Sequence, residues 1–239
     1  MVVFASGVAR KWNVLLVWVI TVDRVSGPIF KESAMTPPYW DQASADLAAG
    51  DERMGELVER YAGLGLVSRG DPFATLARSI VGQQISVKAA DSVWGRFVAA
   101  LGDVSPQAVL AIGEEGLDGC GLSRRKREYV CDLAAHFVEG RLDPAAWSVM
   151  DDEALISALS EVRGIGRWTA EMFLIFNQLR PDVFPLDDLG LRRAVSERYF
   201  AGEKQPRKVV AEFGERWRPW RSVATWYLWR SLDPLPVEY

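Results

Sequence analysis

Two glycines and two carboxylates in the C-terminal third of the chain have a spacing that suits chemistry on a phosphate backbone. Gly164 and Gly166 flank one apolar residue, and Asp187 and Asp188 follow about twenty residues later, beyond an apolar stretch. Glycine tolerates positive φ, so a Gly-x-Gly turn can be tight and expose its backbone N–H groups. Such groups favour an anion where they open a helix, because the positive end of the helix dipole lies there. The pattern predicts a phosphate-binding turn followed by a reactive acid.

The elements that must position these residues are predicted to be two helices joined by the glycine turn. Apolar residues recur at helical spacing over 155–162, and a second helix is expected to begin near Arg167. Together they form a helix-hairpin-helix over about 155–180, a motif that contacts DNA phosphates without reading the base sequence. The pattern is not a dinucleotide-binding motif, since no third glycine follows at the required spacing and no strand precedes it. The simpler alternatives are a plain turn for the glycines and a helix cap for the aspartates.

From Thr36 onward the sequence predicts helices separated by short turns, and hence an all-α fold. Capping residues, prolines and apolar periodicity mark the ends of the helices. The expected helices lie within 39–60, 71–81, 87–101, a short one from Ser105, 123–138, one from Asp143, 190–199, 207–216 and 220–229. No pair of strands and no alternation of strand and helix is found in this pattern.

Five stretches resemble the DNA-3-methyladenine glycosylase II family, within the helix-hairpin-helix (Gly/Pro-Asp) DNA glycosylase superfamily. They are GIGRWTA (164–170), VFPLDD (183–188), IVGQQIS (80–86), GLSRRKREYV (121–130) and RWRPWRSVATWYLW (216–229). The resemblance runs from about Pro37 to Leu232. It implies two helical subdomains with the active-site cleft between them, and an enzyme that excises alkylated purines from double-stranded DNA in base excision repair.

Asp188 matches the catalytic aspartate of this family, and Asp187 is expected to shape the loop or to cap the helix that begins near Leu189. Base excision passes through a cationic, oxocarbenium-like sugar, which a carboxylate stabilises while it orients the attacking water. Bifunctional relatives carry a lysine nucleophile where this chain has Trp168. The resemblance therefore implies a monofunctional N-glycosyl hydrolase without lyase activity, which leaves an abasic site.

Three further residues match positions that hold and expose the damaged base in the family. Trp168 and Trp229 correspond to aromatic residues of the base pocket, where a cationic or electron-poor alkylated purine stacks on an aromatic face. Met172 replaces a tyrosine of the pocket, and its thioether is adaptable but lacks a π face. Gln84 corresponds to the side chain that fills the gap left by the flipped base. The alternatives are core packing for the tryptophans and helix capping for Gln83 and Gln84.

The DNA backbone is expected to be held at the hairpin by Arg167 and by backbone amides of Gly164, Gly166 and Thr169. In the family the hairpin often binds a monovalent cation through backbone carbonyls, which by position are those of Ser160, Val162 and Ile165. A K⁺ or Na⁺ there would offset repulsion between a phosphate and the acid. The cationic side chains of the expected footprint are Arg163, Arg167, Arg192, Arg193, Arg207, Lys208, Arg216, Arg218 and Arg221. The cluster Arg124–Arg127 is either a further contact or a solvated helix face.

The composition limits the cofactors and the strength of DNA binding. The chain has 239 residues and a net charge of −4, but residues 161–239 carry 13 Lys and Arg against 11 Asp and Glu. We expect modest DNA affinity with a moderate salt dependence. Cys120 and Cys131 cannot supply the four thiolates of an iron–sulfur cluster and are expected to be buried, reduced thiols. The single histidine, His136, is expected to be structural.

Residues 1–34 are expected to be an N-terminal extension outside a glycosylase domain of residues 35–239. The uncharged run 12–22 is too short to span a bilayer as a helix, and no convincing signal-peptidase site follows it. It is either an appended arm or a segment upstream of a start at Met35. We expect no membrane association, and a monomer in the bacterial cytoplasm that associates with the nucleoid while it acts.

Two other functions are compatible with parts of the pattern. A non-catalytic helix-hairpin-helix protein would bind DNA but would need neither Asp188 nor the pocket tryptophans. A glycosylase for oxidised or deaminated bases would share the fold. The absent lysine argues against the bifunctional oxidised-base branch, and the cysteine count argues against the iron–sulfur branches.

Overall fold

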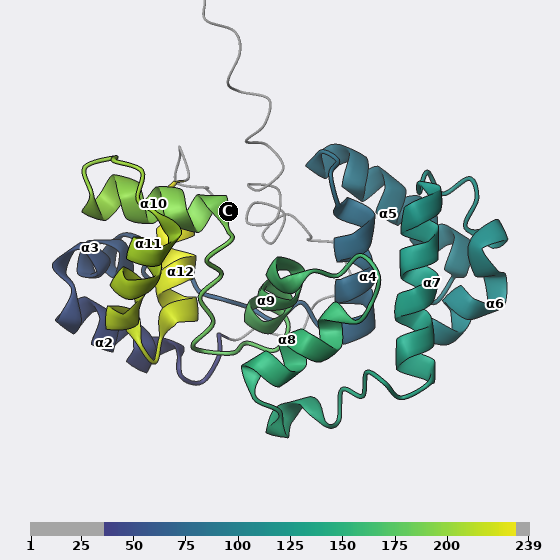
Figure 1. Cartoon of the computed structure of the whole chain (residues 1–239), viewed down its shortest axis with the longest axis horizontal. Helices are drawn as coiled ribbons and strands as arrows, with labels where there is room; N and C mark the ends of the chain where they lie inside the picture. Colours follow the sequence, from purple (N-terminus) through teal and green to yellow (C-terminus); the bar gives the residue numbers. More distant parts are fainter. Residues whose placement is uncertain (1–35, 233–239) are drawn as a thin grey trace, which may run out of the picture. The chain divides into compact units, whose positions relative to one another are not determined.

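The computed structural model describes residues 36–232, and these residues contain helices and no strand. The predicted N-terminal extension, residues 1–34, lies outside the described residues. The helices are α2 (Trp40–Gly50), α3 (Glu52–Arg60), α4 (Pro72–Gly82), α5 (Val87–Leu101), α6 (Pro106–Gly116), α7 (Arg124–Val138), α8 (Asp152–Ser160), α9 (Arg167–Phe176), α10 (Leu189–Tyr199), α11 (Arg207–Gly214) and α12 (Arg221–Arg230), with short 3₁₀ turns η1 (Trp147–Val149) and η2 (Glu215–Trp217) (Figure 1). The all-α prediction is confirmed. No helix of residues 36–232 is both long and apolar enough to cross a membrane.

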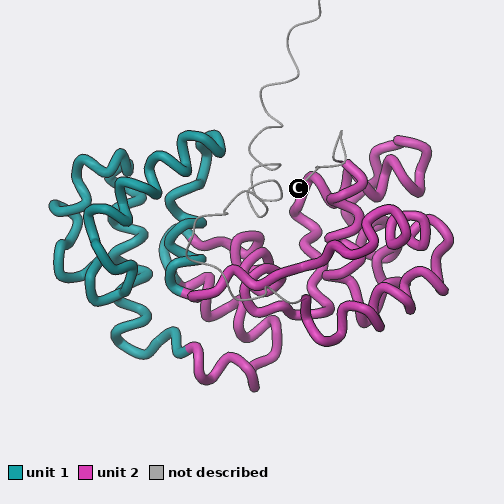
Figure 2. Tube along the Cα trace, turned by 180° about the vertical axis from the view of Figure 1, so that it is seen from behind, with its two compact units in different colours: residues 1–27, 73–143, 162–164 teal, residues 28–72, 144–161, 165–239 magenta. Residues whose placement is uncertain are grey.

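The described residues form two compact helical units (Figure 2). The first unit comprises residues 73–143 and 162–164, and so contains α4 to α7 and, of the glycine turn, Gly164. The second comprises residues 36–72, 144–161 and 165–232, and contains the other helices. Within residues 36–232 the chain passes between the units four times, at the residues where these ranges meet.

The core of the first unit is formed by α4, α5, α6 and α7. Helix α6 packs against both α5 and α7, and Phe97 and Leu133 are fully buried. The rings of Phe73 and Phe137 meet edge to face with centroids 5.4 Å apart. The cap of α7 is Ser123, whose side chain accepts a hydrogen bond from the Lys126 amide, as a serine before a helix favours.

The core of the second unit surrounds α12, which packs against α2, α3 and α10. Every residue from Ser222 to Arg230 is buried, as expected of a helix enclosed on all sides. Its Trp226 meets Trp40 of α2 edge to face with centroids 5.2 Å apart. The Tyr61 hydroxyl donates to the Arg230 carbonyl at 2.6 Å and so satisfies a carbonyl at the helix end.

Three expected helices differ from the observed ones. The span 39–60 is two helices, because Asp51 is extended at φ −151° and its side chain caps α3 through the Met54 amide. The expected helix from Asp143 is wrong: that segment forms turns and η1. The carbonyls of Trp147 in η1 and of Met150 after it accept hydrogen bonds from Arg180. Tertiary contacts there replace helical bonds. Helix α11 ends at Gly214, and η2 follows it.

Candidate active site

The glycine turn joins α8 to α9, as predicted. Asp151 caps α8 by accepting a hydrogen bond from the Ala154 amide at 2.8 Å. Gly164 has φ +90°, and a Cβ at this position would overlap the ring of Tyr129. Both its backbone conformation and its neighbour therefore require glycine.

Gly166 caps α9 at φ −93°, and this residue has no side chain to accept a hydrogen bond from the first amides of the helix. A Cβ at this position would meet nothing within 4 Å. Neither backbone conformation nor packing within the described chain therefore requires glycine here. The open space lies over the first turn of α9, where the helix dipole favours an anion.

Asp188 lies at the start of α10 and is only 3% exposed. Its Oδ1 accepts hydrogen bonds from the Leu191 amide at 2.6 Å and from Trp229 Nε1 at 2.9 Å. Its Oδ2 accepts one from Trp168 Nε1 at 3.1 Å. Asp188 is thus a helix cap, but the cap uses one oxygen, and the two indoles hold the carboxylate in a fixed orientation.

Burial raises the pKa of Asp188, because the charged form loses hydration. The hydrogen bonds from Leu191, Trp229 and Trp168 oppose that rise by favouring the ionised form. Asp187 does not cap α10, which corrects one of the two roles expected for it. Its exposed carboxylate pairs instead with Arg207, 3.0 Å from Oδ1 to Nε.

The three residues predicted to form the base pocket differ in exposure. Trp168 is half-buried, whereas Trp229 and Met172 are 3% and 1% exposed. Trp229 stacks on Phe176 with centroids 5.7 Å apart. The structure brings both tryptophans to Asp188, from α9 and α12, whereas Met172 lies in the core. Their role as hydrogen-bond donors was missed from the sequence, although a buried indole N–H usually requires an acceptor.

Comparisons with known proteins show the family to which the chain belongs. The family model described as HhH-GPD superfamily base excision DNA repair protein matches residues 77–219. The chain belongs to this superfamily. The structure of a DNA-3-methyladenine glycosidase from Bacillus halodurans is similar, with a TM-score of 0.73 and 35% identity, covering 79% of this chain and 88% of that one.

Two further proteins are similar to this chain. DNA-3-methyladenine glycosylase 1 of Schizosaccharomyces pombe is 30% identical over 197 residues, which cover 80% of this chain and 86% of that protein. Its structure in complex with abasic DNA gives a TM-score of 0.69 and covers 80% of this chain and 96% of that one. YfjP of Bacillus subtilis is 30% identical over 188 residues, which cover 75% of this chain and 66% of that protein.

Arg167, at the first position of α9 in the HhH-GPD hairpin, is held by two carboxylates of the second unit. Its Nη1 donates to Glu153 at 2.8 Å, and its Nε donates to Glu171 at 3.0 Å. Glu171 is 5% exposed, and its Oε2 is buried without a hydrogen-bond partner. Burial raises the pKa of Glu171 to about 7, although the Arg167 guanidinium opposes the rise. The sequence analysis did not single out Glu171, whose only signal was a carboxylate within an apolar helix.

The remaining predicted contacts stay predictions, but their positions are clear. Gln84 is exposed in the turn after α4, at φ +60°. Thr169 is buried in the first turn of α9, so only its backbone amide suits a phosphate. Within residues 36–232 no amide donates to the carbonyls of Ser160, Val162 and Ile165. Their binding of a monovalent cation stays a prediction from the resemblance.

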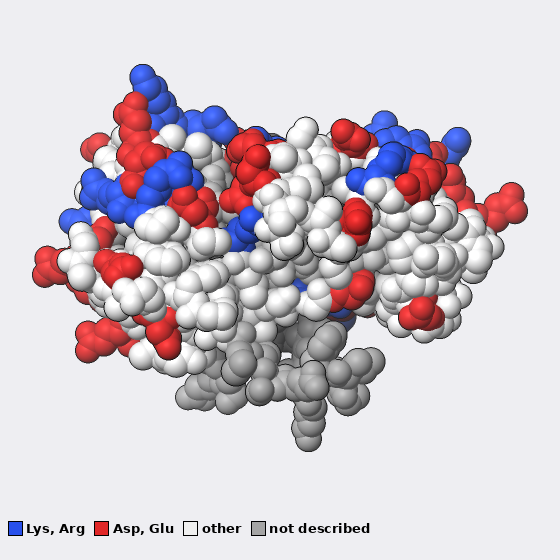
Figure 3. All heavy atoms as spheres, turned by 90° about the horizontal axis from the view of Figure 1, so that it is seen from below, with Lys and Arg blue, Asp and Glu red and all other residues white. Residues whose placement is uncertain are grey.

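Most cations of the predicted footprint are paired with carboxylates of the chain itself. The pairs join Arg163 to Asp132, Arg193 to Glu197, Arg207 to Asp187, Lys208 to Glu212, and Arg218 and Arg221 to Asp182 and Glu215. Arg216 lies over the Phe213 ring, 3.7 Å from its centroid. Arg192 differs, since its Nε is buried without a partner and no described residue forms an ion pair with it. Figure 3 shows Lys and Arg side chains interspersed with Asp and Glu on the face that it draws.

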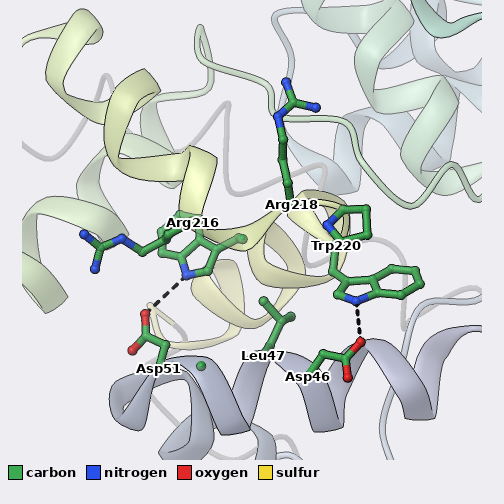
Figure 4. Close-up of a pocket in the computed structure, with 9 residues that line it drawn as sticks. Asp46, Leu47, Asp51, Arg216, Arg218 and Trp220 are labelled. Carbon is green, nitrogen blue, oxygen red and sulfur yellow. Dashed lines mark hydrogen bonds between the residues drawn. The ribbon is translucent and has the colours of Figure 1, made fainter.

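A separate hollow of about 140 Å³ lies within the second unit, between α2 and the segment 216–220 (Figure 4). Trp220 donates its indole N–H to Asp46 at 2.8 Å, and Trp217 donates to Asp51 at 3.2 Å. Trp217 and Trp226 are buried, whereas Trp220 is only half-buried. None of the residues predicted for the base pocket lines this hollow.

The histidine and the cysteines lie in the first unit. His136 is buried, its Nδ1 lies 2.8 Å from the Asp132 carbonyl, and its Nε2 contacts Arg141. This position fits the structural role that the sequence predicts. Both cysteines are free thiols, but only Cys120 is fully buried, and Cys131 is partly exposed.

Proposed function

We propose that the chain is a monofunctional DNA glycosylase that excises alkylated purines from double-stranded DNA in base excision repair and leaves an abasic site. One observation carries the proposal: the buried carboxylate of Asp188 is oriented by the indoles of Trp168 and Trp229, beside a hairpin of the HhH-GPD type. The names of the Bacillus and yeast relatives support the alkylated-base class.

The chemistry follows from the placement of the carboxylate. A negative charge in a poorly hydrated site stabilises a developing oxocarbenium ion more strongly than it would in water. The indole N–H groups and the Leu191 amide favour the ionised form of Asp188 and keep it oriented before the reaction. The same carboxylate can orient the water that attacks the sugar once the base has left.

The hairpin supplies the grip on the DNA backbone. The first amides of α9 and the open space at Gly166 suit a phosphate oxygen. A K⁺ or Na⁺ held by the carbonyls of Ser160, Val162 and Ile165 would add positive charge beside that phosphate. Arg167 binds the same phosphate only if it leaves Glu153 and Glu171.

Trp168 determines the reaction type that we propose. It occupies the position of the lysine nucleophile in bifunctional relatives, and an indole cannot form a Schiff base with the sugar. Its half-buried ring instead offers a face on which a cationic purine can stack. The protein is further proposed to act as a monomer in the cytoplasm.

The test is the release of methylated purines from alkylated duplex DNA by wild type, Asp188→Asn and Asp187→Asn. Asparagine is also a good helix cap, so Asp188→Asn is expected to fold and to bind DNA. It is expected to lose about 100-fold or more of the excision rate, whereas Asp187→Asn stays within a few-fold of wild type. Strand cleavage should appear only after alkali.

The outcomes separate the alternatives. Wild-type protein that binds DNA but releases no base from a panel of alkylated, oxidised and deaminated lesions would overturn the glycosylase assignment in favour of a DNA-binding role. Release of oxidised or deaminated bases alone would overturn the substrate class. Cleavage without alkali would overturn the monofunctional mechanism.

A further inference from the structure

The basic cluster Arg124–Arg127 on α7 has one member with an unusual environment. Arg124 pairs with Glu128 at 2.9 Å, Arg127 pairs with Asp118, and Arg125 is exposed. Lys126 is partly buried, and its ammonium donates to two backbone carbonyls of the same unit, those of Val81 and Gln83, at 2.7 Å each. Lys126 therefore does not belong to a solvated face. Burial lowers its pKa, and no carboxylate compensates for the lost hydration.

The two carbonyls belong to the end of α4 and to the turn that carries Gln84. Carbonyls at a helix C-terminus lack helical partners, and a cation there also meets the negative end of the helix dipole. The turn is strained, because Gln84 has φ +60°, a conformation that residues with a Cβ rarely adopt. Such a conformation persists only where its surroundings hold it. Lys126 donates two of the hydrogen bonds that hold the Gln84 turn in this conformation.

The same turn is tied to the glycine turn of the hairpin within the first unit. The side-chain amide of Gln83 donates to the Gly164 carbonyl at 2.8 Å. The ring of Tyr129 lies against Gly164, and Tyr129 follows Lys126 by about one turn of α7. One face of α7 thus contacts both the turn that carries Gln84 and the glycine turn of the hairpin at Gly164.

We propose that Lys126 is a positioning residue of the glycosylase, holding the Gln84 turn in register with the hairpin so that Gln84 enters duplex DNA as the base is flipped. The proposal rests on the proposed function, because Gln84 needs a duplex to act on. It assigns to Lys126, within the basic cluster, a role distinct from phosphate contact. Lys126 is expected to affect the extrusion of the base from the duplex and not the hydrolysis of the N-glycosidic bond.

This role makes a specific demand on the substrate. Extrusion of a base from a duplex requires unstacking and unpairing, whereas a base in a single strand is already largely accessible. A misplaced Gln84 should therefore slow excision from a duplex and leave excision from a single strand unchanged. A loss of fold, or of the Asp188 site, would slow both.

The experiment compares Lys126→Met with Lys126→Arg and with Arg125→Met, the matched control that removes the same charge from the same helix. Single-turnover excision is measured on an oligonucleotide with one 7-methylguanine, as a duplex and as a single strand. Lys126→Met is expected to slow duplex excision about tenfold or more and to leave the single-strand rate within about twofold. Lys126→Arg, which can still donate to both carbonyls, and Arg125→Met should keep both rates.

A double-mutant cycle with Gln84→Ala tests whether Lys126 acts through Gln84. In the Gln84→Ala background, Lys126→Met is expected to cause no further loss on the duplex. Fully additive losses, equal losses on both substrates, or a similar loss with Arg125→Met would overturn the positioning role while the proposed function stands. Wild-type protein inactive on both substrates and on the panel of lesions described above would overturn the proposed function and this role with it.

Discussion

Replacement of Glu171 by glutamine is expected to remove a loss of folding stability that the wild type undergoes as the pH rises. The Glu171 carboxyl is buried in α9, with one oxygen paired with Arg167 and the other without a partner. Its pKa is raised from 4.5 to about 7, and the main cause is the loss of hydration on burial. The folded protein therefore binds a proton at Glu171 more tightly than the unfolded chain does.

A carboxyl group whose pKa is higher in the folded protein than in the unfolded chain stabilises the fold fully at pH values below the unfolded-state pKa. This stabilisation is lost as the pH rises through the folded-state pKa. One pKa unit corresponds to about 1.4 kcal/mol, so between pH 5 and pH 8 the wild type should lose about 2 to 3 kcal/mol that arises from Glu171. Glutamine resembles the protonated form and does not titrate. The unfolding free energy of wild type minus that of Glu171→Gln should fall by this amount over the interval.

Urea unfolding of both proteins at several pH values between 5 and 8 measures this difference, and other titrating groups largely cancel in it. Glu153→Gln is the matched control, because Glu153 binds the same Arg167 but is exposed, and that bond lowers its pKa below 4.5. The unfolding free energy of wild type minus that of Glu153→Gln should not change above pH 5. A Glu171→Gln difference that also stays constant within about 0.5 kcal/mol would refute the reasoning, since Glu171 would then titrate near its ordinary value.

Four further substitutions test other parts of the site. Gly164→Ala is expected to cost about 2 to 4 kcal/mol of unfolding free energy, from a strained φ and an overlap with a ring, whereas Gly166→Ala costs less than about 1 kcal/mol; urea unfolding measures both. Trp229→Phe keeps an aromatic ring but removes the indole N–H that donates to Asp188. Because that hydrogen bond favours the ionised carboxylate, the acid limb of the kcat/KM pH profile should move to higher pH. Arg192→Ala is expected to reduce the slope of log affinity against log salt by about 1 if its unpaired guanidinium meets a phosphate; an unchanged slope would exclude that contact.

The sequence was sufficient for the features that depend on local chemistry. The tight turn at Gly164 follows from residue type and spacing, and the structure agrees, because Gly164 has φ +90°. The all-α class follows from periodicity alone. The family resemblance located Asp188, which a pattern of two aspartates before a helix would have left as a cap.

Other features depend on contacts between residues far apart in the chain. Nothing in the sequence states that Trp168 and Trp229, from two different helices, donate to one carboxylate, or that Lys126 reaches the end of α4. The helix expected from Asp143 failed for the same reason, since Arg180 binds the carbonyls that helical bonds would have used. Long-range hydrogen bonds decide these cases, and periodicity does not report them.

The internal pairing of the arginines has a consequence for how such an enzyme finds damage. Only a few lesions occur among a vast excess of undamaged base pairs, so time spent on intact DNA limits the search. A protein whose cations are engaged by its own carboxylates holds the polyanion loosely and leaves intact stretches quickly. Its residence at a lesion is then governed by the extruded base, so the efficiency of the search should change little across the range of cellular salt.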